Sequence, residues 1–380
     1  MIYLDYSATT PCAPQVLAAM APYFRDRFGN PSSSHAFGRE AKAAVEKARL
    51  QLAEFVGCGP GEIVFTSGAT ESNNLIFLSL LLDAKEKRRK IAVSAIEHKS
   101  VLLPAKNLGT RGFDLTLLPV TSNGIVDINV ARKLITEDTA LVSVHTANNE
   151  IGTIQPVKEL AEIAHRVGAK FHTDAAQALG KMPFDAQQLD CDLASFSSHK
   201  IYGPKGIGAL YIRGGSRKWP WDYPLYGGGQ ESGIRPGTYN VPAIVGFGEA
   251  AVLIRQQEND YLSKLQMVTS LCSNIIQSSY PKARIIGEGE RKLFGILCFL
   301  IPYIHADALS TSSSSICVSH GSACNSGTLG ISHVIQNLGL TEQEAVSTFR
   351  VSLSADTTED DLIMLQKELS HYVDEGMGTI

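Results

Sequence analysis

Short apolar segments alternate with stretches of helical apolar spacing through the first two thirds of the chain. A strand-like segment at 63–65 leads into a helix that extends to about Leu82, and another helix is expected between Pro156 and Gly168. The segments expected to be strands are 63–65, 91–95, 141–144, 169–171, 193–196 and 208–212. This alternation predicts an α/β protein with a mostly parallel sheet covered by helices on both faces.

The pattern changes beyond residue 240. A helical stretch from about Val241 to Ser279 is expected to lead into a smaller α+β unit, with a strand at 349–353 and a last helix that begins after Thr358. A chain of 380 residues is too long for one compact core. We therefore expect an N-terminal arm (1–14), a large α/β domain (15–245) and a small C-terminal domain (246–380).

Composition narrows the classes of partner. The net charge of -4 and a pI near 6.2 argue against nucleic acid or an anionic membrane surface. The longest apolar stretch, 75–82, is far shorter than the roughly 20 residues that cross a bilayer, and no signal-peptide pattern opens the sequence. The seven cysteines are scattered without a paired spacing. We therefore expect no disulfide framework, no metal site and a reducing cytoplasm.

Polar residues recur where the expected strands end. His98, Asn149, Asp174, Gln177 and Lys200 each lie at or just beyond the carboxyl end of a strand-like segment. Any one of them is more often structural, and a lysine beside a turn is usually a surface residue. Five at equivalent positions favour a ligand site, because ligands of open α/β sheets bind outside the carboxyl ends of the strands. A partly desolvated lysine there can form a Schiff base with an aldehyde.

Three segments that contain glycine add candidate chemistry. Gly68 lies between a strand and a helix, so backbone N–H groups at the helix start, with the Thr70 hydroxyl, suit a phosphate, although no Walker motif is present. The loop 227–238 is either a linker or a cover for a site. Cys324 lies among glycine and serine residues, which predicts an exposed loop. An isolated cysteine is usually a structural thiol, and this context favours a reactive one.

A series of short motifs occurs in one order along the chain. They are 3–10 (YLDYSATT), 30–33 (NPSS), 66–74 (TSGATESNN), 97–98 (EH), 148–152 (NNEIG), 174–177 (DAAQ), 197–206 (SSHKIYGPKG), 227–231 (GGGQE), 235–238 (RPGT) and 321–324 (GSAC). In these motifs the sequence resembles the cysteine desulfurases, the NifS/IscS-like branch of the class V aminotransferase family. The resemblance implies a fold-type I transferase dependent on pyridoxal phosphate, with a seven-stranded sheet between helices.

The resemblance also implies roles for individual residues. Lys200 is expected to bind the cofactor covalently and to move protons. Asp174 is expected to pair with the pyridine nitrogen, and His98 is expected to stack on the ring and to assist proton transfer. The resemblance implies that Gln177 and Asn149 contact the phenolic oxygen, and that Ala69, Thr70, Ser197 and His199 bind the phosphate. It implies that Thr238 contacts the phosphate in the other subunit of a homodimer. It also implies that Arg350, with Asn149, binds the substrate.

The implied activity is removal of sulfur from L-cysteine. Cys324 is expected to attack the substrate sulfur, which gives L-alanine and a persulfide on Cys324. The persulfide sulfur then passes to an acceptor such as an iron–sulfur scaffold protein. The Cys324 thiol could also transiently ligate a nascent iron–sulfur cluster. Ser354 stands where the family usually has glycine. Little chain follows the last helix, so the identity of the sulfur acceptor is left open. The alternatives are a selenocysteine lyase, another aminotransferase or lyase of this fold, and a binding scaffold without turnover.

Overall fold

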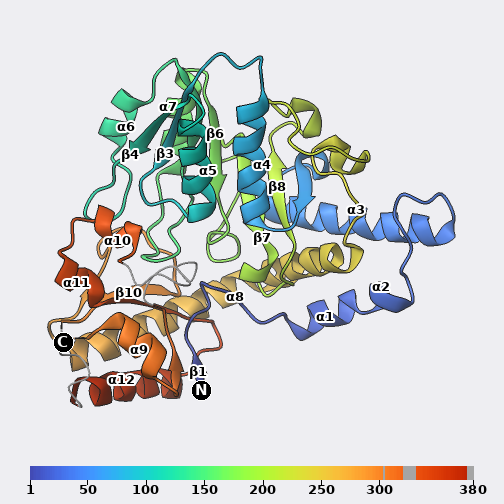
Figure 1. Cartoon of the computed structure of the whole chain (residues 1–380). Coiled ribbons are helices and arrows are strands. Elements are labelled where there is room, and N and C mark those ends of the chain that lie inside the picture. Colours follow the sequence, from blue (N-terminus) through green and yellow to red (C-terminus); the bar gives the residue numbers. More distant parts are fainter. Residues whose placement is uncertain (303, 320–330, 375–380) are drawn as a thin grey trace.

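The computed structural model describes residues 1–302, 304–319 and 331–374. A large sheet lies between helices, and the long helix α8 (Val241–Ser279) runs past it to a smaller unit (Figure 1). The bounds predicted for α8 are confirmed. No helix in the described ranges is long and apolar enough to cross a membrane.

The large sheet has seven strands in the order β2-β8-β7-β6-β5-β3-β4. β8 runs opposite to the other six strands, which are parallel to one another, so the predicted mostly parallel sheet is confirmed. In chain order the strands are β2 (Ile63–Thr66), β3 (Lys90–Ser94), β4 (Asp114–Leu118), β5 (Thr139–Ser143), β6 (Lys170–Asp174), β7 (Leu193–Ser197) and β8 (Gly208–Ile212). The sequence pattern missed β4, because this edge strand is partly exposed and has no continuous apolar run.

Successive residues of the central strands enter different hydrophobic cores. Leu141 and Leu193 pack with α4 (Ala69–Leu82) and α5 (Lys99–Gly109), whereas Val142 and Ala194 pack with the helices of the other core. Those helices include α3 (Ala36–Val56), α6 (Ile128–Leu134), α7 (Val157–Arg166) and the start of α8. Burial on both faces explains why β5 and β7 contain mainly apolar and small residues, whereas β6 carries buried polar side chains at its carboxyl end.

The smaller unit has its own antiparallel sheet, β12 (Thr348–Ser352), β10 (Ile296–Leu300) and β9 (Arg284–Ile285). Leu265, Cys272 and Ile276 of α8 pack into its core, whereas Ile244 and Phe247 pack into the large one. The boundary expected at 245/246 thus falls within a helix that both cores share. In the described residues this unit also contains the helices α9 (Ala306–Ser312), α10 (His333–Asn337), α11 (Glu342–Val346) and α12 (Glu359–Asp374).

The N-terminal arm joins the two units. β1 (Ile2–Tyr3) pairs in parallel with β11 (Ile316–Cys317), so the chain begins beside the smaller unit (Figure 1). The arm then passes the carboxyl edge of the large sheet, where the Thr10 backbone N–H donates to the carbonyl oxygen of His199 (3.0 Å). The helices α1 (Pro14–Met20) and α2 (Pro22–Arg25) follow, and α1 packs on α8. This path carries residues 5–9 to the place where the candidate side chains meet.

Candidate active site

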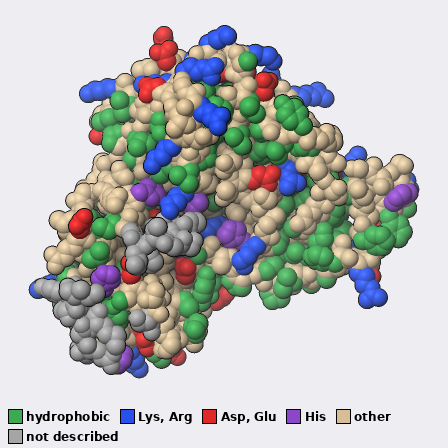
Figure 2. Space-filling model, viewed as in Figure 1, with side chains coloured by type: hydrophobic (Ala, Val, Ile, Leu, Met, Phe, Trp, Pro, Cys, Tyr) green, Lys and Arg blue, Asp and Glu red, His purple; other side chains and the backbone are tan. Residues whose placement is uncertain are grey.

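A cavity of about 490 Å³ opens at the carboxyl edge of the large sheet. Histidine, lysine and arginine side chains gather near the middle of the face shown in Figure 2. Of the residues predicted from the sequence, those lining the cavity are Ala69, Thr70, His98, Asn149, Asp174, Gln177, Ser197, His199, Lys200 and Arg350. Thr238 is exposed and does not line it, and Cys324 lies outside the described residues.

Lys200 is held by the N-terminal arm. It ends the short helical turn η2 (Ser198–Lys200), which directly follows β7. Its Nζ donates to the backbone carbonyl oxygens of Ser7 (2.6 Å) and Ala8 (2.8 Å). The amine is therefore fixed at the cavity by two acceptors from a segment almost 200 residues away, which the sequence pattern alone does not predict.

Asp174 is the last residue of β6 and is almost completely buried. Its Oδ2 accepts from Nδ2 of Asn73 and its Oδ1 accepts from the backbone N–H of Ala176 (2.8 and 3.0 Å). Nδ2 of Asn73 also donates to Oγ of Ser100, and that hydroxyl hydrogen-bonds Nδ1 of His98 (2.8 Å each). Asn73 and Ser100 were not predicted as site residues. They connect the carboxylate to the imidazole, and the motif 66–74 was the signal for Asn73.

The start of α4 forms an anion cradle. Gly68 has a φ of +156° and lies against Gly208, where an added Cβ would come within 2.5 Å of the Gly68 Cα. This close packing directs the first turn of α4, with Ala69 and Thr70, at the cavity, next to Ser197. Glu71, which we did not predict, flanks the cradle, and its Oε1 accepts from Nε of Arg235 (2.9 Å).

His199 completes this end of the cavity as a neutral side chain. Its Nδ1 hydrogen-bonds the hydroxyl of Thr9 (3.1 Å). Burial, followed by the positive charges of Lys200, Lys205 and Lys181, lowers the pKa of His199 to about 4. The ring therefore contributes one N–H donor at neutral pH.

Arg350 reaches the cavity from β12 of the smaller unit and is 1% exposed. Its Nη2 donates to Oδ1 of Asp5 (2.6 Å) and its Nη1 donates to the carbonyl oxygen of Asn149 (2.9 Å). Within the described residues its buried Nε has no hydrogen-bond partner. A guanidinium with a spare donor at a cavity can bind a carboxylate. Sequence reasoning placed Arg350 here and missed Asp5, whose partner is 345 residues away.

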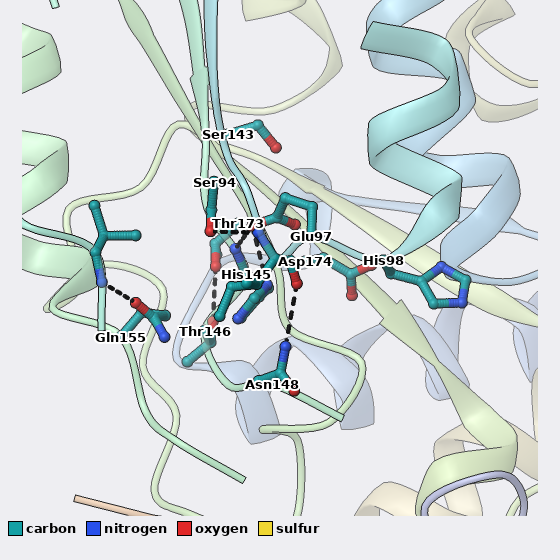
Figure 3. A network of polar contacts seen from close by, with 12 residues as sticks. Ser94, Glu97, His98, Ser143, His145, Thr146, Asn148, Gln155, Thr173 and Asp174 are labelled. Atoms are coloured by element: carbon teal, nitrogen blue, oxygen red, sulfur yellow. Dashed lines mark hydrogen bonds and ion pairs between the residues drawn. The ribbon is translucent and has the colours of Figure 1, made fainter. Parts of the chain in front are cut away.

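A buried acid–histidine pair lies beneath the cavity. Oε1 of Glu97 accepts from the backbone N–H of His145 (2.6 Å) and lies 3.0 Å from its Nδ1. Figure 3 shows Glu97 directed toward His145, whereas its neighbour His98 points to another side. His145 lines the cavity and follows β5, so it has the same strand-end signal as the predicted residues, yet it was not among them.

Fold and site together define an α/β protein in which an amine, a carboxylate, a guanidinium and an anion cradle converge at one edge of the sheet. A profile of the aminotransferase class-V family matches residues 2–365, and the chain belongs to this family.

Several similar proteins carry the name cysteine desulfurase or NifS-like protein. The chain is 41% identical to "Cysteine desulfurase IscS 1" of Archaeoglobus fulgidus, over 98% of this chain and 97% of that protein. A solved structure named "NifS-like protein" matches with a TM-score of 0.90 at 36% identity, over 98% of this chain and 99% of that one. The structure "SspA in complex with cysteine" matches with a TM-score of 0.80 at 34% identity, over 94% of this chain and 100% of that one.

Proposed function

We propose that this chain is a cysteine desulfurase that uses pyridoxal phosphate to convert L-cysteine to L-alanine, with the sulfur passing to Cys324. The supporting observation is that Lys200, Asp174 and Arg350 line one cavity in a chain 41% identical to a named cysteine desulfurase. The test is direct. The purified protein should have a visible absorption band near 400 nm, and with cysteine and a reductant it should release alanine and sulfide in equal amounts.

The donor set at the cavity fits the cofactor. Lys200 offers an amine for its aldehyde, and the first turn of α4, with Thr70, Ser197 and His199, offers donors for a phosphate. Asp174, already held by two donors, can accept a hydrogen bond from a protonated ring nitrogen. Gln177 and Asn149 would hydrogen-bond the phenolic oxygen, and His98 would stack on the ring. When bound, pyridoxal phosphate supplies an electron sink for negative charge at the α-carbon.

Residues of the chain bind the substrate and carry out the sulfur transfer. Arg350, with Asn149, orients the substrate carboxylate. The thiolate of Cys324 attacks the substrate sulfur, the bond between sulfur and the β-carbon breaks, and its electron pair stays on the carbon. That carbon takes a proton, moved by Lys200 or His98, so that alanine leaves and Cys324 carries a persulfide.

Assembly is part of the same proposal. The segments around α1 to α3 expose several apolar side chains, of which Phe24 and Phe28 are 68% and 67% exposed (Figure 2). Apolar exposure of this kind suits an interface between two copies of the chain. In such a homodimer the exposed Thr238 would contact the phosphate in the other subunit. We further propose the domain division at 245/246, a cytoplasmic location, and transfer of the persulfide sulfur to an iron–sulfur scaffold or another acceptor.

A selenocysteine lyase uses the same cavity residues and does not need Cys324. Comparing cysteine with selenocysteine as substrate in the wild type and in Cys324→Ala separates the two functions. A desulfurase loses its cysteine activity in the variant, whereas a selenocysteine lyase keeps its selenocysteine activity.

Replacing Asp174 with asparagine tests the ring-nitrogen contact. Asp174→Asn should still bind the cofactor, and turnover should fall by at least about a hundredfold, because an amide cannot stabilise the protonated nitrogen electrostatically. Alanine release measures the loss, and the absorption spectrum measures binding. Asp192→Asn is the control, since this carboxylate pairs with Lys170 at the other end of the strands. Near-normal turnover in Asp174→Asn contradicts the assigned contact.

Replacing Arg350 with lysine tests substrate binding. A lysine keeps the charge opposite Asp5 and lacks the planar set of donors, so the KM for cysteine should rise about tenfold or more. The absorption band should be retained. Arg213→Lys is the control, because Arg213 pairs with Asp190 away from the cavity. An unchanged KM in Arg350→Lys would exclude the carboxylate contact.

A further inference from the structure

A buried lysine lies just outside the cavity. Lys181 is 5% exposed, and its Nζ donates to Oε1 of Gln177 (2.8 Å). No carboxylate among the described residues lies within 4.0 Å of this ammonium group. A buried charge without a counter-charge destabilises the protein, and an anion that binds close by would offset this cost. The charged side chains that act on it are Lys200 and Arg350, both positive.

Local backbone geometry brings Lys181 onto Gln177. After β6 the chain makes one tight turn, in which the backbone N–H of Leu179 donates to the carbonyl oxygen of Ala175 (3.1 Å). Gly180 then adopts a φ of +73°, where an added Cβ would lie 2.8 Å from the side chain of Ile201, so this position requires glycine. The turn places residues 177 and 181 on one side. Gln177 faces the cavity, and Lys181 lies behind it.

The Gln177 amide is held at both of its ends. Its Oε1 accepts from Lys181, and its Nε2 donates to the carbonyl oxygen of Ser7 (2.9 Å). That same carbonyl accepts from Nζ of Lys200 (2.6 Å). An ammonium group only donates, so it fixes the oxygen of the amide on the Lys181 side. The second N–H of Gln177 is then left for the cavity.

We propose that Lys181 is a positioning residue, which holds the Gln177 amide with its N–H donors toward the cavity and adds a positive charge behind the phenolic oxygen of the cofactor. This inference rests on the proposed function and extends it to a residue that does not contact the cofactor. Burial, then the charges of Lys200 and Arg350, lower the pKa of Lys181 to about 7. The protonation of Lys181 therefore depends on the charge of the group that binds in the cavity.

The charge on Lys181 has a predicted signature in the protein without cofactor. Its pKa is about 7 when folded and near 10.5 when unfolded, so the unfolded chain binds the proton more tightly. Burial of the charged Lys181 therefore destabilises the folded protein. This effect is fully present below pH 7 and disappears as the pH rises toward 10.5. Lys181→Met should therefore raise the melting temperature relative to the wild type more at pH 6.5 than at pH 9.5. A difference that is constant with pH contradicts a buried, titrating Lys181.

The decisive experiment measures binding rather than turnover. The affinities of the cofactor-free protein for pyridoxal phosphate and for its 3-deoxy analogue, which lacks the phenolic oxygen, are compared in wild type and Lys181→Met. The variant should lose about tenfold in affinity for pyridoxal phosphate and little for the analogue. The pH midpoint of the visible band should also rise by about half to one unit, because a neighbouring positive charge is gone.

Two further substitutions separate orientation from charge. Lys181→Gln keeps a donor for Gln177 without the charge, so it should shift the pH midpoint and keep most of the affinity, whereas Lys181→Arg should restore both. Lys181→Gln also serves if the methionine variant fails to fold. Lys292→Met is the matched control, since Lys292 is a half-buried lysine whose pKa is also lowered, and it donates to the carbonyl oxygen of Ile286 (2.6 Å) away from the cavity.

The outcomes separate this inference from the proposed function. Equal loss of affinity for both ligands, or a wild-type midpoint in both neutral variants, overturns the role of Lys181 while wild-type alanine release stands. A wild type that has no visible band and releases no alanine from cysteine overturns the proposed function itself.

Discussion

Lys200→Ala is expected to lose at least about a thousandfold in alanine release and to lose every covalent link to the cofactor. The reason is that Lys200 is the amine that the arm carbonyls of Ser7 and Ala8 hold at the cavity. Noncovalent binding should persist, because the start of α4 is unchanged. Reduction with borohydride, followed by peptide mass spectrometry, should fix the cofactor on the peptide of Lys200 in the wild type and nowhere in the variant.

A matched control comes from the same cavity. Lys205 also lines it and has no assigned covalent role, so Lys205→Ala should keep the link on Lys200. Cofactor fixed covalently in Lys200→Ala, or turnover close to that of the wild type, would remove Lys200 from the reaction.

Cys324→Ser is expected to bind the cofactor and cysteine normally and to lose at least about a hundredfold in sulfide and alanine release. A serine hydroxyl is a poor nucleophile toward sulfur, whereas a thiol with a pKa near 8.5 is partly ionised at neutral pH. Mass spectrometry of the cysteine-treated wild type should find one added sulfur on the peptide that contains Cys324, and none in the variant.

Four of the described cysteines are poor alternatives to Cys324 as the nucleophile. Desolvation by burial raises the pKa of Cys58, Cys191, Cys272 and Cys298 to about 12, so these thiols stay protonated at neutral pH. Cys12→Ser is a suitable control, since Cys12 is only half-buried and should be dispensable. Added sulfur on another cysteine, or full activity in Cys324→Ser, would contradict the proposed transfer.

The sequence alone determined the parts of the site that depend on local order. Strands buried on both faces are rich in apolar and small residues, so the alternation of β5 and β7 with helices could be recognised in the sequence, whereas β6 was recognised only from its first residues. The carboxyl ends of parallel strands meet at one edge of the sheet, so the sequence alone predicted that Asp174 and Lys200 lie close together. The strand, glycine and helix at 63–82 predicted the anion cradle, because backbone N–H groups are free at the start of a helix.

Only the tertiary structure decided the contacts between distant segments. Asp5 meets Arg350, and Ser7 accepts from both Gln177 and Lys200, because β1 joins the smaller unit and carries the arm across the sheet edge. Edge strand β4 was missed because its side chains are half in solvent and show no apolar run. Lys181 carries no motif, and its role depends on burial, which arises from packing of the whole chain and which no spacing along the sequence encodes.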